Sequence, residues 1–224
     1  MNLPFTPEQF LSVFEQYNVA VWPLQILLNM LGLAAIVLAV RKTNLSNRLI
    51  IAILAFLWMW IGIAYHLAVF AAINPGAYAF AALNIIQGII FLTIGLSKDK
   101  LSFNFRSNIY GIIGAILIVY AMVLYPLLGY ALGHVYPKAP TFGLPCPTTI
   151  FTFGLLLWTD KKVPKSVLII PLLWSLIGFS AALKLGIFED TGLLVAGVAG
   201  VVLILVRDRT VPSPAPAVSG NSPV

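Results

Sequence analysis

The chain has 224 residues, of which 60% are hydrophobic and only 9% are charged. A soluble domain carries about 25% charged residues, so this composition excludes a soluble globular protein and predicts an integral membrane protein. The formal net charge is +6, which would suit nucleic acid only if the cations formed one binding patch. The single cysteine excludes an intramolecular disulfide.

The first segment, residues 1–19, carries two glutamates and no Lys or Arg. A cleaved signal peptide needs a basic start, so we expect this segment to be retained. Its Phe5, Phe10, Leu11 and Phe14 fit one face of a helix. This pattern predicts a helix that lies at the membrane interface.

Apolar runs near the 20-residue length of a membrane span follow one another through the chain. They predict an all-α membrane domain over residues 20–206, in which the fifth and seventh spans are short. The seven expected spans are 20–40, 49–71, 77–97, 109–130, 144–158, 166–184 and 191–206. The remaining tail, 207–224, is rich in Pro, Ser and Ala and is predicted to be disordered.

The basic residues alternate between the connections in a way that orients the bundle. Eleven of the thirteen fall on one side, and Lys138 and Lys184 fall on the other. The eleven are Arg41, Lys42, Arg48, Lys98, Lys100, Arg106, Lys161, Lys162, Lys165, Arg207 and Arg209. By the positive-inside rule, the N-terminus is expected outside and the C-terminus inside. The charge is thus explained by orientation, and nucleic-acid binding is excluded.

An internal repeat is visible at an offset of 116 residues. LWMWIGIA at 57–64 matches LWSLIGFS at 173–180, which aligns Trp58 with Trp174. Transporters are often built from such repeats, although apolar helices also resemble one another by chance. We expect two parallel three-helix units, in each of which the third helix packs with the first two. Repeat one is 20–97, the linker helix is 109–130 and repeat two is 144–206.

This 3+1+3 topology resembles the SWEET sugar transporters, in which two three-helix bundles enclose a central cavity. The resemblance implies polar and aromatic side chains, notably Asn and Trp, in that cavity. Trp58, Trp174 and Asn84 fall at suitable depths here. The chain departs from a symmetric pattern because Gly200, rather than an asparagine, aligns with Asn84.

Two further stretches carry a closer resemblance. LPFTPEQFLSVFEQYNVAVWPLQ at 3–25 and GHVYPKAPTFGLPCPTTIFTFGLLL at 133–157 resemble an uncharacterised family of bacterial multi-pass membrane proteins. This resemblance implies a membrane location and brings no activity or cofactor with it.

Polar side chains within the apolar runs are the candidate binding residues, because burying them in lipid is costly. The candidates for substrate binding are Asn29, Trp58, Tyr65, His66, Asn84, Gln87 and Trp174. The alternative is that the amides join helices and the tryptophan rings only fill space. For His66 the alternatives are a neutral imidazole bonded to a neighbour, proton sensing or ligand contact.

Five other residues could form an outer-face metal site: Cys146, His134, His66, Glu189 and Asp190. A closed zinc site needs four ligands, and a copper site also uses thiolate and imidazole. No CxxC, HxxxH or HExxH spacing is present, so we favour no metal. The chain also lacks the spacing of a catalytic triad or paired carboxylates. We therefore predict no catalytic residues, no enzyme activity and no cofactor.

Together these features predict a multi-pass protein of the bacterial plasma (inner) membrane that binds or transports a small solute between two bundles. One alternative is an accessory or sensor subunit that packs against a partner, and another is an outer-face metal-binding protein. The expected partners are the lipid bilayer and the solute, and a homo-oligomer is compatible with them. If the polar side chains of the spans converge on one cavity, solute binding is favoured. If they face lipid, contact with a partner protein is favoured.

Overall fold

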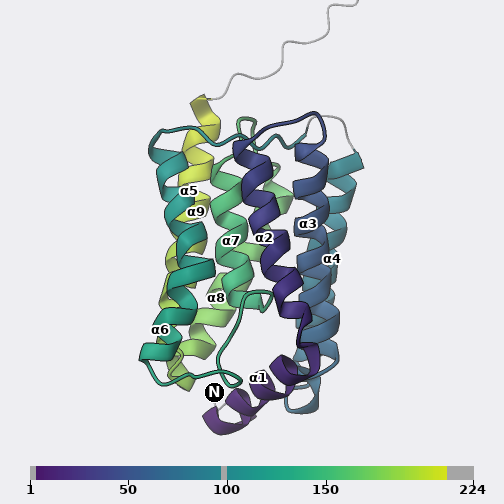
Figure 1. Cartoon of the computed structure of the whole chain (residues 1–224), viewed down its shortest axis with the longest axis vertical. Helices are drawn as coiled ribbons and strands as arrows, with labels where there is room; N and C mark the ends of the chain where they lie inside the picture. Colours follow the sequence, from purple (N-terminus) through teal and green to yellow (C-terminus); the bar gives the residue numbers. More distant parts are fainter. Residues whose placement is uncertain (1–3, 97–99, 211–224) are drawn as a thin grey trace, which may run out of the picture.

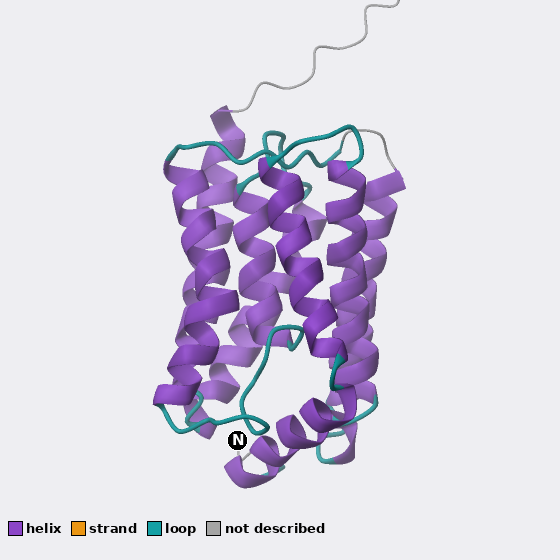
Figure 2. Cartoon of the chain, in the orientation of Figure 1, coloured by secondary structure: helices purple, strands orange, loops and turns teal. Residues whose placement is uncertain are grey.

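The computed structural model describes residues 4–96 and 100–210, and every regular element in these ranges is a helix (Figure 1, Figure 2). Most of the helices stand side by side in one bundle, and α1 lies across one end of it (Figure 1). The predicted all-helical class is therefore confirmed.

Helices occupy all seven predicted apolar ranges, and α1 precedes them. In chain order they are α1 (Pro7–Val21), α2 (Leu24–Val40), α3 (Ser46–Trp60) continued by the π-helical η1 (Ile61–Leu67) and the short η2 (Phe70–Ala72), α4 (Ala77–Leu96), α5 (Ile109–Val119) continued by the π-helical η3 (Tyr120–Leu124) and α6 (Tyr125–Ala131), α7 (Pro145–Leu157), α8 (Lys165–Leu185), η4 (Phe188–Asp190) and α9 (Thr191–Thr210). Pro126 explains the widened turn of η3, because its ring displaces a carbonyl of the preceding turn.

Five helical segments are long and apolar enough to cross a membrane, or six if the bent pair α1 and α2 is one span. The five are Ser46–Ala72, Ala77–Gly95, Ile109–Ala131, Lys165–Leu185 and Phe188–Thr210. The chain is therefore a multi-pass membrane protein, but the count of seven spans is not confirmed. The helix α7 has only 13 residues, which cover about 20 Å of a hydrocarbon core roughly 30 Å thick.

A loop before α7 explains why this helix is short. Residues 132–144 turn from the end of α6 into the bundle before α7 begins (Figure 1). Irregular backbone at such depth must bond to protein or water. The Asn18 side-chain amide donates to the carbonyls of Pro137 (2.6 Å) and Ala139 (2.7 Å). Pro145 then occupies the first turn of α7, where a missing N–H costs nothing.

The connections that carry most of the cations meet at one end, which we call the basic end. Lys42 Nζ lies 2.9 Å from Asp160 Oδ2 and 2.8 Å from Ser102 Oγ, which joins three connections. Asp208, near the end of α9, accepts from the backbone N–H of Val163 at 2.7 Å. We call the opposite end, where α1 lies, the α1 end. The side of the membrane that each end faces stays a prediction, and Lys98 lies outside the described residues.

Residues 207–210, predicted to belong to a disordered tail, are helical. α9 continues through residues 207–210 because Arg207 donates to the carbonyls of Leu156 (2.9 Å) and Leu157 (3.2 Å) at the end of α7. The rest of the predicted disordered tail, 211–224, lies outside the described residues.

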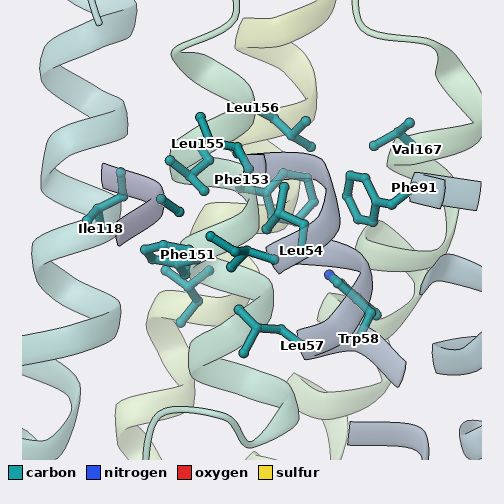
Figure 3. Close-up of a cluster of buried hydrophobic side chains, with 14 of the residues drawn as sticks. Leu54, Leu57, Trp58, Phe91, Ile118, Phe151, Phe153, Leu155, Leu156 and Val167 are labelled. Carbon is teal, nitrogen blue, oxygen red and sulfur yellow. The ribbon is translucent and has the colours of Figure 1, made fainter. Parts of the chain in front are cut away.

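The core joins the two halves of the bundle. Figure 3 shows its side chains, with Leu54, Leu57 and Trp58 from α3, Phe91 from α4, Ile118 from α5, and Phe151, Phe153, Leu155 and Leu156 from α7. Trp58 is fully buried, and its Nε1 donates to Thr152 Oγ1 at 3.1 Å. Lipid tails are as apolar as these side chains, so close packing and hydrogen bonds hold the helices together.

The two halves pack in different orders. In the second half α9 packs along both α7 and α8, as expected of a third span. In the first half α3 is the middle helix, and α4 packs chiefly against α3 and η1 instead of against both partners. α5 packs against α7 at the edge of the bundle in Figure 1. The expectation that the third span packs with both others is therefore wrong for the first half, and the duplication itself stays a prediction.

Candidate functional site

A cavity of about 160 Å³ lies at the α1 end. It is enclosed by α1, the η1–η2 segment, the start of α7 and the second half of α8. Its lining is mainly apolar and aromatic, and includes Phe5, Phe10, Phe14, Tyr65, Phe70, Phe80, Tyr125, Cys146, Trp174 and Asp190.

The helix α1 covers this cavity with aromatic rings. Phe10 and Phe14 are one turn apart on α1, and their ring centroids lie 4.7 Å apart. Phe10 also meets Phe70 at 5.7 Å, and Phe14 meets Tyr65 at 6.1 Å. The N-terminal half of α1 thus rests on the bundle through ring contacts, which allow an edge-to-face fit without polar bonds.

The local sequence explains where α1 begins and how its other half is held. Thr6 and Gln9 form a capping box at its start, with bonds of 2.9 and 3.3 Å, which satisfies free N–H groups of the first turn. Toward its end, Tyr17 OH accepts from Trp60 Nε1 at 2.7 Å. Asn18 Oδ1 accepts from Gln25 Nε2 at 2.6 Å. The chain then turns by 88° into α2.

The polar edge of the cavity comes from the turn before α9. Tyr125 OH donates to Asp190 Oδ1 at 2.5 Å. The neighbouring carboxylate, Glu189, lies 2.8 Å from His134 Nδ1 through its Oε1. Both acids are buried, and buried carboxylates need such partners because they have lost hydration. Only Asp190 of the two lines the cavity.

His66 lies behind the cavity lining, inside a ring of aromatic side chains. It is fully buried, and its ring lies 5.0–5.9 Å from the rings of Tyr65, Phe70, Phe80 and Trp174. Within the described residues, neither of its ring nitrogens has a hydrogen-bond partner, and Trp174 Nε1 has none either. Buried polar atoms are almost always paired in folded proteins. These three atoms are therefore suited to an additional hydrogen-bonding group.

Further buried polar atoms continue inward from His66 along α4. Asn84 uses its amide N–H to bond the Phe80 carbonyl at 2.8 Å, and Gln87 bonds the Val167 carbonyl of α8 at 3.2 Å. Within the described chain, the side-chain oxygens of both amides lack a partner. We call His66, Trp174, Asn84 and Gln87 the polar column. From the level of Phe80, whose ring contacts His66, to Gln87 it follows α4 for about 10 Å at 1.5 Å per residue.

The structure places the seven candidate binding residues in four different locations. Tyr65 and Trp174 line the cavity, with His66 directly behind them. Asn84 and Gln87 lie deeper, between α4 and its neighbours. Trp58 belongs to the core, and Asn29 bonds the Gln25 carbonyl of its own helix at 2.9 Å beside a shallow groove elsewhere.

Several lining residues were not among the predicted binding residues. Phe10 and Phe14 were assigned to the membrane interface, and Tyr125 and Phe70 were not singled out. The aromatic face of the first segment was the available signal. The position of this aromatic face over the cavity depends on the bend before α2, and no local sequence pattern predicts that bend.

The five metal candidates do not form a metal centre in the described residues, where no three His, Cys, Asp or Glu side chains are grouped to hold an ion. His134 pairs with Glu189, whereas His66 lies among aromatic rings. Cys146 lines the cavity beside Asp190.

Comparison with known families gives one match. The model of a family of unknown function, DUF6064, covers residues 7–213. The chain belongs to this family. Membership in DUF6064 confirms the resemblance to an uncharacterised family that the two sequence stretches carry. No curated protein matches the chain, and no solved structure matches it either. The function of this DUF6064 member must therefore be argued from its geometry.

Proposed function

We propose that this membrane protein binds a small, mainly apolar molecule with one hydrogen-bonding group in the cavity at the α1 end. The observation that carries the proposal is an aromatic cavity with a few polar groups at its inner edge, the usual make-up of a small-molecule site. Those groups include Trp174, Cys146 and Asp190. A volume of about 160 Å³ suits a ligand built on one aromatic ring, because a cavity of about 150 Å³ holds benzene.

In this proposal α1 is the cover of the site. Its C-terminal half is held by the Asn18 and Tyr17 bonds, while its N-terminal half rests on Phe10 and Phe14. Ligand exchange then requires the N-terminal half to lift while the anchored half stays in place. If the basic end faces the cytoplasm of a bacterium, as the positive-inside rule predicts, the cavity receives its ligand from outside the plasma membrane.

Transport is a second candidate, and the polar column favours it. The column leads inward from the cavity between α4 and α8, where the two halves meet. In the conformation described, the core around Trp58 and Phe91 fills the space beyond it. Transport would therefore need the halves to separate along this interface, whereas binding needs only α1 to move.

The test uses Cys146, the single cysteine of the chain, as a reporter inside the cavity. The full-length protein in lipid nanodiscs is treated with N-ethylmaleimide, and the reaction rate is measured against increasing 2-phenylethanol. We expect the rate to fall and to saturate, because an occupied cavity blocks the thiol. Glucose should not slow the reaction, and protection by glucose would favour a sugar site instead.

The matched control is Ser107→Cys in a Cys146→Ser background, which places the thiol at an exposed position near the basic end. Its reaction rate should not change with 2-phenylethanol. The proposal fails if single-ring alcohols, phenols and indole all leave the Cys146 rate unchanged. It also fails if the control thiol is slowed to the same extent.

A further inference from the structure

A second hollow lies at the basic end, between α8 and α9. It has a volume of about 610 Å³. Its apolar part is formed by Leu168, Ile169, Leu172, Val201 and Leu205, and its polar part by Lys162, Lys165, Asp208 and Arg209. We call it the α8–α9 groove.

A close contact between the two helices marks the inner end of the groove. Gly197 of α9 packs directly against Ser175 of α8, with Leu172 as the next neighbour. Between this contact and the basic end, side chains of both helices line the hollow. From Leu172 to Lys165 the groove runs about 10 Å at 1.5 Å per residue, a third of the roughly 30 Å hydrocarbon core. Ile169, on its wall, is 62% exposed.

The charge at the end of the groove is strongly positive. Lys162, Lys165 and Arg209 border it, and all three are exposed. The carboxylate of Asp208 is already engaged, since Oδ1 pairs with Arg207 at 2.7 Å and Oδ2 accepts from Val163 N–H at 2.7 Å. Three cations therefore stand where an apolar, lipid-facing groove reaches the level of the head groups.

We propose that the α8–α9 groove binds an anionic phospholipid, with an acyl chain between the helices and the phosphate among the three cations. Basic pockets between membrane helices are suited to anionic head groups, and here the apolar channel continues directly from the charges. The segment 211–224 contains no Asp or Glu side chain and so does not complement the charge. This site is independent of the cavity at the α1 end.

The test measures lipid binding to the detergent-solubilised full chain by native mass spectrometry. The probes are dioleoyl phosphatidylglycerol and dioleoyl phosphatidylcholine, which share acyl chains and differ in charge. We expect phosphatidylglycerol to bind at least tenfold tighter. Each basic residue near an anionic head group contributes about a fivefold gain, so Lys162→Gln, Lys165→Gln and Arg209→Gln together should weaken it roughly a hundredfold.

The matched control removes three cations of the same end outside the groove: Arg41→Gln, Arg48→Gln and Lys100→Gln. It should change phosphatidylglycerol binding by less than about threefold, since the head group does not touch these residues. Val201→Trp fills the groove without changing charge and should weaken both lipids. If the protein with Lys162, Lys165 and Arg209 all replaced by Gln does not fold, Val201→Trp alone serves as the test.

Four results would overturn the proposal. The first two are equal affinity for the two lipids and an equal loss of phosphatidylglycerol affinity in the control variant. The third is full competition by inorganic phosphate at the same concentration as the lipid. The fourth is tight lipid binding only after removal of residues 211–224. The last result would make the tail the occupant of the groove.

Discussion

Replacing His66 by phenylalanine should stabilise the ligand-free protein, although His66 is fully buried. Within the described chain neither ring nitrogen has a partner, and each unpaired buried polar atom costs about 1–3 kcal/mol. The surrounding rings accept a phenyl group, since four aromatic side chains already enclose the position. The larger ring adds overpacking of about 1–3 kcal/mol. Two unpaired nitrogens cost about 2–6 kcal/mol together, so the net gain should be about 1–3 kcal/mol.

The assay is equilibrium unfolding in mixed micelles, with tryptophan fluorescence as the signal. Tyr125→Phe is the matched control, because it removes the hydroxyl that donates to Asp190 at 2.5 Å and leaves a buried carboxylate with one bond fewer. It should destabilise the protein by about 1–3 kcal/mol. His66→Phe should also weaken the protection of Cys146 by 2-phenylethanol. If His66→Phe instead lowers the free energy of unfolding by more than about 1 kcal/mol, the imidazole has a structural partner and the reasoning is wrong.

Three further predictions concern other parts of the molecule. Asn18→Ala removes the bonds that anchor α1. A loss of about 1.4 kcal/mol in the free energy that holds α1 closed corresponds to a factor of ten, so Cys146 should react with N-ethylmaleimide about tenfold faster. Gly154→Ala would place a Cβ 2.8 Å from the carbonyl oxygen of Gly114, so it should lower the free energy of unfolding by about 1–3 kcal/mol. Burial alone would raise the pKa of Asp160, but hydrogen bonds and the charge of its lysine partner hold the pKa below the ordinary 3.8. Because its pKa is lower in the folded state, the ionised Asp160 stabilises the fold at pH values above 3.8. This stabilisation is lost as the pH falls through the folded-state pKa. Asp160→Asn should therefore lower the unfolding temperature at pH 7, with the difference shrinking below pH 3.8.

The positions of the membrane helices could be predicted because the apolar runs are set by the thickness of the bilayer. The predicted span 109–130 corresponds to Ile109–Ala131, and 166–184 corresponds to Lys165–Leu185. The short run at 144–158 also gave a short helix. Its length did not indicate that the preceding loop enters the bundle, because that depends on bonds from Asn18, more than a hundred residues away.

The proposed binding site was harder to predict from the sequence. Tyr65, His66 and Trp174 were selected because polar and aromatic groups stand out against an apolar helix. The sequence did not show that α1 folds over them, since a bend places Phe10 and Phe14 by tertiary contacts alone. The repeat predicted equivalent places for Trp58 and Trp174. Trp58 donates to Thr152 in the core, whereas Trp174 belongs to the same core cluster and also lines the cavity, so their equivalence stays a prediction.

The central claim is that the cavity at the α1 end holds a small, mainly apolar ligand. The most direct measurement is an experimental structure of the full-length protein with 2-(4-bromophenyl)ethanol, using the anomalous signal of bromine. The account predicts a bromine peak inside the cavity, between Phe14 on α1 and Trp174 on α8. Bromine peaks only along the lipid-facing surface, with the cavity closed by the surrounding side chains, would contradict it.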